Sequence, residues 1–240
     1  MAEQMDHTTL LQQEYNNTGT SWTRNEFFDR NGYLIIKNLC DPKKLFHPVP
    51  ELRGQLNYKS KDLDDFTHIE VEGQVEGSVA RYWHPQYREI HTKIRLILEQ
   101  AIGRKLYNTY YYDRFYFPGQ ELTIHADRPA CEISVSVHVS TNLEENWPIW
   151  IKTPDIFTDP SKMELISKGE NRSIDLEPGD GMVYKGCERP HWRDPMPGLI
   201  ETALARAKGY QVHSFYYHQI FFHYVLQDGQ RAHHAWDMAR

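Results

Sequence analysis

The sequence predicts a mainly β protein with helices near its N-terminus, built as a sandwich, barrel or jelly roll. After Gly103 the chain consists of short segments rich in Tyr, Phe, Val and Ile, with no helical segment between most of them. Turn residues such as Pro118-Gly119 and Asp228-Gly229 separate these segments. Residues 132–139, EISVSVHV, alternate polar and apolar side chains as a half-buried strand does. Such a succession favours packed antiparallel sheets over a parallel α/β sheet.

The elements before Gly103 are expected to be fewer and more varied. Residues 1–22 are polar and without periodicity, so we expect a flexible N-terminal arm. Ser21 or Thr23 can cap a short helix that ends at Gly32, and a strand follows in YLIIKNL. Residues 48–80 are charged and irregular, which predicts an excursion over the surface.

The segment 84–103 predicts the longest helix of the chain. Its apolar residues recur at helical spacing, and Gly103 supplies the stop signal. A helical insert is also expected in ETALARAK, residues 201–208. Because neither an internal repeat nor a low-complexity linker is visible, we expect one domain over residues 23–240.

Composition narrows the function. The chain has 240 residues, 40% of them hydrophobic, and a formal net charge of −6. An acidic balance argues against a nucleic-acid partner, which usually selects a basic face. The sequence has no apolar run long enough for a membrane span and no signal-peptide pattern. Three widely spaced cysteines suit a reducing compartment, so we expect a cytoplasmic protein.

His125 and Asp127 are the first candidate metal ligands. They end the β-like run LTIHAD and precede another strand. Side chains two residues apart on a strand point to the same side, so both can reach one ion at the mouth of a barrel. A His-x-Asp sequence arises easily by chance, and its placement between two strands is what gives it weight.

His191 is the third candidate ligand. It follows LEPGDGMVYKG, residues 176–186, which is typical of a strand, a tight turn and a second strand. Two imidazoles and one carboxylate with open positions form the site of non-haem Fe(II) oxygenases. Zinc accepts the same ligands, but a zinc hydrolase also needs a base and an oxyanion pocket. Neither HExxH nor CxxC is present, so the familiar zinc layouts are absent from the sequence.

Four segments in a fixed order resemble one known family. They are NGYLIIKNL, then RFYFPGQELTIHADR, then LEPGDGMVYKG, and finally His191. In this order they resemble the 2-oxoglutarate- and Fe(II)-dependent dioxygenases, in particular the prolyl-4-hydroxylase-like branch. The resemblance implies a double-stranded β-helix of jelly-roll, cupin-like type with its core at about 105–228. It also implies that His125, Asp127 and His191 are the iron ligands.

The resemblance further implies an enzyme that uses O2 and couples decarboxylation of 2-oxoglutarate to hydroxylation of a C–H bond, with ascorbate as a supporting reductant. Asp127 favours hydroxylation, because halogenating relatives lack this carboxylate. A peptidyl substrate, prolyl residues included, and a free amino acid are both implied, and a small metabolite stays open. The chain would act as a monomer or homodimer. A non-catalytic or zinc-binding cupin-like protein is the alternative.

Several residues compete to hold 2-oxoglutarate. Relatives usually bind its far carboxylate with an Arg or Lys shortly after the second histidine, where this chain has Glu201. Arg193 is favoured because a guanidinium makes two parallel bonds to a carboxylate. His218, Arg206 and Lys208 are the other candidates.

Two further positions have two readings each. Tyr116 alternates with Arg114 in DRFYF, so both side chains can face a cavity; the Tyr116 hydroxyl would then reach the oxo acid, although a core tyrosine is equally expected. Arg128 either lines the substrate entrance or forms a surface salt bridge. We treat the C-terminal segment QRAHHAWD as a tail.

Overall fold

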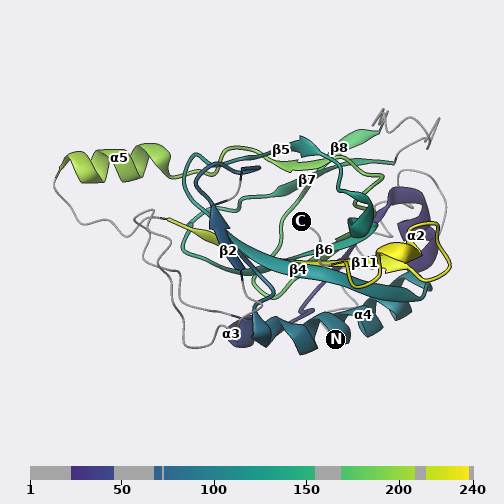
Figure 1. Cartoon of the computed structure of the whole chain (residues 1–240). Helices are drawn as coiled ribbons and strands as arrows, with labels where there is room; N and C mark the ends of the chain where they lie inside the picture. Colours follow the sequence, from purple (N-terminus) through teal and green to yellow (C-terminus); the bar gives the residue numbers. More distant parts are fainter. Residues whose placement is uncertain (1–22, 46–67, 72, 155–168, 209–214, 238–240) are drawn as a thin grey trace.

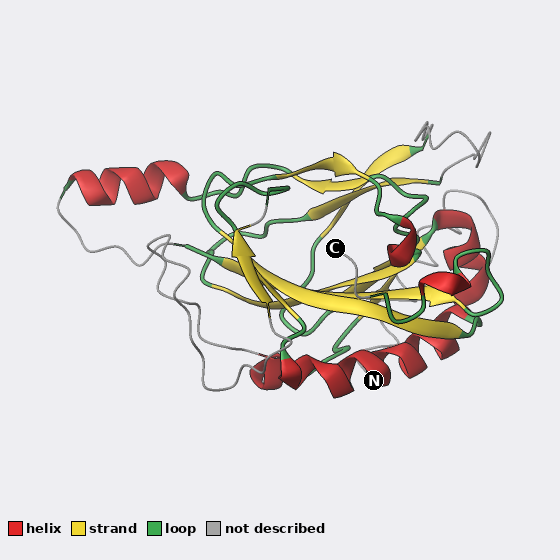
Figure 2. Ribbon diagram, in the orientation of Figure 1, coloured by secondary structure: helices red, strands yellow, loops and turns green. Residues whose placement is uncertain are grey.

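Two antiparallel β-sheets face each other, and helices cover the outer face of the larger one (Figures 1 and 2). The structure is a computed structural model that describes residues 23–45, 68–71, 73–154, 169–208 and 215–237. The predicted flexible arm, residues 1–22, lies outside the described residues.

The strands of the larger sheet are ordered β1-β9-β6-β11-β4-β3-β2. Their bounds are Tyr33–Ile36 (β1), His68–Val71 (β2), Val79–Tyr82 (β3), Leu106–Tyr116 (β4), Ile133–Thr141 (β6), Gly181–Tyr184 (β9) and Tyr217–Leu226 (β11). The smaller sheet is ordered β5-β10-β7-β8. Its strands are Leu122–His125 (β5), Ile149–Thr153 (β7), Glu170–Ile174 (β8) and His191–Arg193 (β10).

The path of the chain from β4 to β11 confirms the expected double-stranded β-helix. It passes from sheet to sheet at each step except the hairpin β7–β8, so strands distant in sequence become neighbours. β6 pairs with both β9 and β11, and β10 with both β5 and β7. This winding brings the end of β5 beside the start of β10.

The helices agree with the sequence signals. They are Arg24–Asn31 (α2), Pro42–Leu45 (α3), Arg88–Ile102 (α4) and Leu199–Ala207 (α5). Thr23 caps α2 through a capping box with Glu26. Gly103 ends α4 at φ 67°, a conformation that favours glycine. The long α4 lies against the larger sheet, whereas α5 projects away from both sheets (Figure 1).

The prediction of an irregular excursion over residues 48–80 was wrong for its last part. β2 and β3 form a hairpin there, and β3 extends the larger sheet by pairing with β4. Residues 46–67 lie outside the described residues. The charged sequence HIEVEG did not look like a strand. β2 stands at the edge of the larger sheet, where charged residues are common in strands.

β11 divides its side chains between two layers. Ile220, Phe222 and Tyr224 belong to the core beneath α4, and the Tyr224 hydroxyl donates to the His91 carbonyl at 2.7 Å. Tyr217 and Phe221 belong to the core between the two sheets. Odd-numbered positions of β11 therefore face the smaller sheet, and even-numbered positions face α4.

A buried ionic cluster occupies the α4 side of β4 and β11. Asp113 is bound by the Arg81 guanidinium and lies 2.6 Å from Nε2 of His218. The Tyr87 hydroxyl donates to the same carboxylate at 3.3 Å. The Asp113 and His218 side chains are fully buried, so their charges and hydrogen bonds must be satisfied within the protein.

None of the helices in the described ranges is both long and apolar enough to cross a lipid bilayer.

Candidate metal centre and cavity

His125 and His191 face each other across two paired strands. His125 ends β5 and His191 begins β10, and the two residues are direct partners in the antiparallel ladder. Side chains of directly opposed residues project to the same side of a sheet. The two imidazole rings accordingly lie 4.4 Å apart between their centroids.

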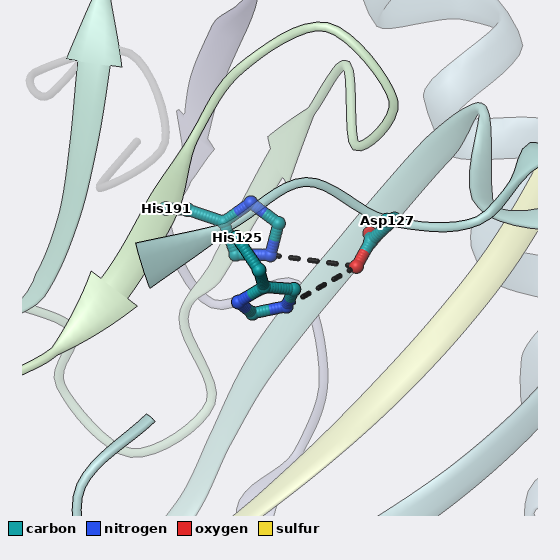
Figure 3. A group of neighbouring side chains, drawn as sticks. All are labelled: His125, Asp127 and His191. Carbon is teal, nitrogen blue, oxygen red and sulfur yellow. Dashed lines mark ion pairs between the residues drawn. The ribbon is translucent and has the colours of Figure 1, made fainter. Parts of the chain in front are cut away.

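Asp127 completes a compact group of three donors (Figure 3). Its Oδ1 lies 3.6 Å from Nε2 of His125 and 3.5 Å from Nε2 of His191. The three ligand atoms all fall within 4.8 Å of one another, the spacing of groups that can hold one ion. The structure therefore brings together the three residues that the sequence singled out.

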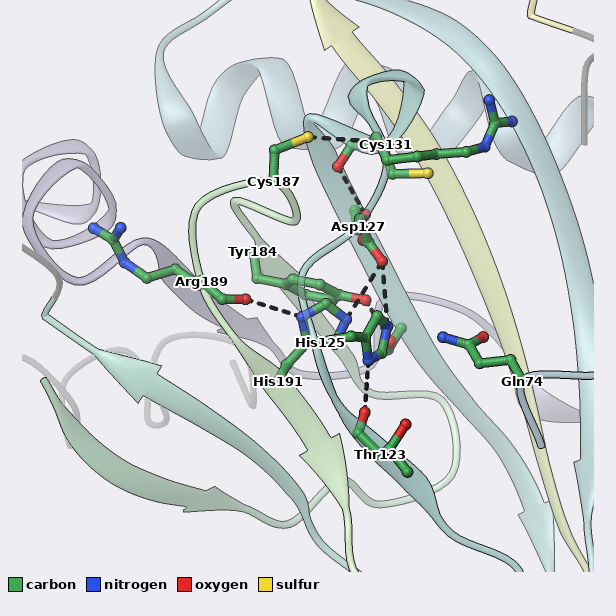
Figure 4. Close-up of polar contacts among 12 residues, drawn as sticks. Gln74, Thr123, His125, Asp127, Cys131, Tyr184, Cys187, Arg189 and His191 are labelled. Atoms are coloured by element: carbon green, nitrogen blue, oxygen red, sulfur yellow. Dashed lines mark hydrogen bonds and ion pairs between the residues drawn. The ribbon is translucent and has the colours of Figure 1, made fainter. Parts of the chain in front are cut away.

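The far side of each imidazole is fixed by a backbone carbonyl (Figure 4). Nδ1 of His125 lies 2.8 Å from the Thr123 carbonyl, and Nδ1 of His191 lies 3.0 Å from the Arg189 carbonyl. Because a carbonyl only accepts, Nδ1 carries a hydrogen in both rings, so Nε2 is the nitrogen that faces Asp127 and that a metal would bind. Outer hydrogen bonds of this kind orient metal-binding histidines. The donor set thus fits a divalent metal ion.

Asp127 is held by the loop before β10 and by β6. Its backbone N–H donates to the Gly186 carbonyl at 2.9 Å, and Ser134 Oγ donates to its Oδ2 at 2.7 Å. A β-carbon at position 186 would collide with Oδ2 of Asp127 and Oγ of Ser134, so only glycine allows this approach. With Oδ2 occupied by Ser134, Oδ1 faces the two histidines.

Electrostatics keep the Asp127 carboxylate ionised. Burial alone would raise its pKa, but the adjacent imidazoles of His191 and His125 outweigh burial and hold the pKa well below its usual range. Burial likewise opposes the charged form of His191, and Asp127 overcomes it, so that the pKa of His191 is raised. A charged carboxylate is the form that binds a cation.

Replacing Ser134 with alanine should weaken metal binding without removing a ligand. The Ser134→Ala variant loses the bond that orients Oδ2 of Asp127, and we expect metal affinity to fall by about tenfold. Ser140→Ala is the matched control, because the Ser140 hydroxyl lies further along β6 and has no partner in the described part of the chain. Calorimetric titration with Ni2+ measures both. Equal affinities in the two variants would contradict the orienting role.

A cavity of about 360 Å³ opens beside the three donors. Arg114 of β4 and Arg128 line it together with a row of tyrosines, Tyr82, Tyr110 and Tyr112. Arg114 donates to the Tyr116 hydroxyl and to Oε1 of Gln74, both at 3.2 Å. Figure 4 shows Gln74 on the same side of the metal centre as His125. The cavity therefore combines cationic and phenolic groups next to the metal donors.

Arg128 stands at the mouth of the cavity with the C-terminal segment. Its Nη1 lies 2.6 Å from Oδ2 of Asp237, and its guanidinium lies over the Tyr110 ring at 4.5 Å. Arg128 thus forms a salt bridge and also lines the cavity; that it lines a substrate entrance stays a prediction. The segment that we treated as a tail instead packs near the site.

The predicted oxo-acid anchors lie elsewhere. Arg193 is buried between the rings of Trp147 and Tyr217, and its Nη2 donates to Oε1 of Gln219 at 2.8 Å. It is not among the described residues that line the cavity, and neither is Tyr116.

His218 occupies an even-numbered position of β11, so it faces α4 and binds Asp113, away from the cavity. Arg206 belongs to α5, the helix that projects from the sheets, and Lys208 directly follows this helix. Neither His218 nor Lys208 lines the cavity within the described ranges.

Arg114 and Arg128 are the cations that line the cavity among the described residues. From the sequence we expected Arg114 to face a cavity beside Tyr116 but did not select it as the anchor. Tyr110, Tyr112 and His223 line the cavity as well and were not selected. In β4 every residue after Tyr107 is buried, so apolar alternation does not tell which face is inward. β11 is likewise buried on both faces, so no local pattern in the sequence marked these three residues.

Comparison with known proteins agrees with the fold. Neither a protein-family model nor a curated protein matches the sequence. Solved structures do match. The 2OG-Fe(II) oxygenase-family protein of Burkholderia pseudomallei is 10% identical, with a TM-score of 0.52 over 84% of this chain and 88% of that one.

Two further solved structures match over a similar share of the chain. The non-haem alpha-ketoglutarate-dependent epimerase SnoN from nogalamycin biosynthesis is 12% identical, with a TM-score of 0.52 over 82% of this chain and 80% of that one. HygX from Streptomyces hygroscopicus, solved with nickel, 2-oxoglutarate and hygromycin B, is 11% identical, with a TM-score of 0.50 over 82% and 84%. At these identities the likeness shows that the chain has the fold of 2-oxoglutarate oxygenases.

Proposed function

We propose that this protein is a non-haem Fe(II) dioxygenase that couples decarboxylation of 2-oxoglutarate to hydroxylation of a C–H bond in a peptidyl or free amino-acid substrate. The observation that carries the proposal is the convergence of His125, Asp127 and His191, with both Nε2 atoms directed at Oδ1 of Asp127 and both Nδ1 atoms held by carbonyls. Two imidazoles and one carboxylate leave open positions for an oxo acid and O2.

Fe(II) bound by these three residues would supply the oxidising chemistry that links O2 to 2-oxoglutarate and substrate. The protein itself would orient the metal donors and exclude bulk water from the site. Ser134 and the two backbone carbonyls hold the donors, so little reorganisation is needed on binding. Burial of His191 and the tyrosine row limits access of bulk water to the site.

Arg114 is our candidate for the far carboxylate of 2-oxoglutarate, in place of the favoured Arg193. It lines the same cavity as the metal donors and presents a planar guanidinium to it. Both arginines already donate to side chains and lie against aromatic rings, and Arg193 is set apart because it is not among the described residues that line the cavity.

The size of the cavity favours a small substrate or a single side chain of a larger one. Ligand cavities commonly measure about 300–1,000 Å³. At about 360 Å³ this cavity is near the lower end, and part of it must hold the oxo acid. A free amino acid or one residue of a peptide satisfies that limit.

The direct test is a turnover assay with purified protein, Fe(II), ascorbate and 2-oxoglutarate. We expect succinate to form above a metal-free control, because oxo-acid decarboxylation proceeds slowly even without substrate. Mass spectrometry of candidate substrates then checks for the gain of one oxygen atom. Metal binding without any succinate would contradict the proposal and favour a non-catalytic, metal-binding cupin-like protein.

Replacing Arg114 with leucine should raise the KM for 2-oxoglutarate by about 10- to 100-fold, because a hydrogen-bonded charge pair is lost. The Arg193→Leu variant is the control, for which we expect a lower Tm and an unchanged KM. Initial rates of succinate formation measure both constants. A raised KM in the Arg193 variant alone would return the anchor to Arg193.

A further inference from the structure

His223 is a buried histidine of the cavity to which the proposed reaction assigns no role. It lies near the end of β11 and is only 2% exposed, yet it lines the cavity. Its ring lies 4.6 Å from that of Tyr110 and 5.9 Å from that of Tyr112. Its neighbours on the cavity side are therefore mostly aromatic.

Ser134 fixes which nitrogen of His223 carries the hydrogen. Ser134 Oγ lies 2.7 Å from Oδ2 of Asp127 and 3.0 Å from Nδ1 of His223. An ionised carboxylate only accepts, so Ser134 donates its single hydrogen to Asp127 and accepts one from Nδ1. Nε2 of His223 is then the acceptor. Burial lowers the pKa of His223 to about 4, which agrees with a neutral ring.

Nε2 of His223 has no partner in the described part of the chain. A buried polar atom without a hydrogen bond costs free energy comparable to the bond it lacks, and such atoms are rare in native structures. An unpaired acceptor on the wall of a ligand cavity is therefore expected to gain its partner from the ligand.

A metal ion is a weaker explanation for this lone pair. Asp127, Cys131 and His223 also lie within 4.8 Å of one another by their ligand atoms. However, burial raises the pKa of the Cys131 thiol well above its usual range, and its sulfur lies 3.2 Å from the Tyr110 hydroxyl. A protonated thiol is a poor ligand. Ser134 already occupies Oδ2 of Asp127.

The oxo acid cannot satisfy His223 either. At neutral pH 2-oxoglutarate carries two carboxylates and a ketone, all of which are acceptors. An acceptor atom placed at Nε2 would be repelled. The missing partner must be an N–H or O–H group. Water can supply it in the open cavity, and a substrate that displaces this water must supply it instead.

We infer that Nε2 of His223 accepts a hydrogen bond from a hydroxyl or amine group of the substrate. The inference rests on the proposed function and names its substrate class. The portion of substrate inside the cavity is polar and carries an N–H or O–H donor near the metal centre. A purely aliphatic or fully methylated portion leaves His223 unpaired and binds less tightly.

Matched probes test this role in the presence of Ni2+ and 2-oxoglutarate, with nickel in place of the reactive iron. Ethanolamine, glycerol, benzyl alcohol and benzylamine are each compared by ligand-observed NMR with a counterpart in which every hydroxyl is a methyl ether and every amine a quaternary trimethylammonium group, so that no N–H or O–H remains. We expect wild-type protein to bind at least one donor-bearing probe about fivefold tighter than its methylated partner, the effect of one hydrogen bond. His223→Leu should reduce this ratio to about one, and His223→Gln, which keeps an acceptor, should restore it.

A ratio near one for every pair in wild-type protein would overturn the inference. The inference would also be overturned if the His223→Leu variant kept the wild-type affinity ratio. A preference that depends only on the size of the methyl groups would survive that substitution. Thermal unfolding of the same samples separates the two proposals. If neither Ni2+ nor 2-oxoglutarate raises the wild-type Tm, the proposed function fails. If both raise it and no pair discriminates, only the role of His223 fails.

Discussion

Replacing Asp127 with alanine should reduce succinate formation to the metal-free background. The variant loses one of three metal donors, and its carboxylate is the only ionised one in the group. Loss of a group that merely orients a ligand commonly costs 10- to 100-fold in affinity or activity, so loss of the ligand itself should exceed about 100-fold. Coupled assays of succinate, with metal content measured in parallel, provide the readout.

Asp228→Ala is the matched control for this variant. Asp228 is an exposed aspartate in the turn after β11, outside the cavity, and its removal should leave turnover unchanged. Wild-type succinate formation by the Asp127→Ala variant would show that this carboxylate is not a metal ligand.

The second large effect concerns stability. The Asp113→Asn variant should lower the free energy of unfolding by about 3–5 kcal/mol, the usual cost of breaking a buried ion pair on one side. It leaves the Arg81 guanidinium buried without its carboxylate and takes the charge partner from His218. Urea unfolding followed by circular dichroism measures the loss. Asp29→Asn, which breaks an exposed pair with Arg104, should cost less than about 1 kcal/mol.

The contribution of the Asp113 carboxylate to the free energy of unfolding also depends on pH. Burial opposes ionisation of Asp113, but Arg81 and His218 outweigh it and hold its pKa well below its usual range. A depressed folded-state pKa stabilises the protein above the unfolded value of about 4, and the effect is lost as the pH falls through the folded value. The difference in free energy of unfolding between wild type and Asp113→Asn should therefore become smaller as the pH is lowered. If the Asp113 and Asp29 variants lost the same free energy of unfolding at neutral pH, the buried cluster would not have the stabilising role proposed for it.

Local signals in the sequence were sufficient for most of the strands and helices and for the proximity of His125 and Asp127. Turn residues and aromatic-rich segments marked the strands, and Thr23 and Gly103 marked helix boundaries that the structure confirms. The spacing of His125 and Asp127 encoded their proximity, because a short segment has few ways to separate them. Only the winding of the sheets could place His191 beside them, and the resemblance supplied that winding.

The direction in which buried strand residues face could not be predicted. β4 and β11 are covered on both sides, so apolar residues occupy odd and even positions alike. A shift of one residue in the register of a strand moves the residues of one face to the other. That is why His218 was selected and His223 was not. Contacts between distant segments, such as Arg128 with Asp237, carry no local pattern at all.

Titration of Ni2+ into the apo protein by calorimetry tests the metal centre most directly. We expect one ion per chain for wild type, and affinity lower by at least about 100-fold in His125→Ala, Asp127→Ala and His191→Ala. His233→Ala, which removes an exposed histidine outside the cavity, should bind as wild type does. Wild-type affinity in all three ligand variants would show that these side chains do not share a metal ion.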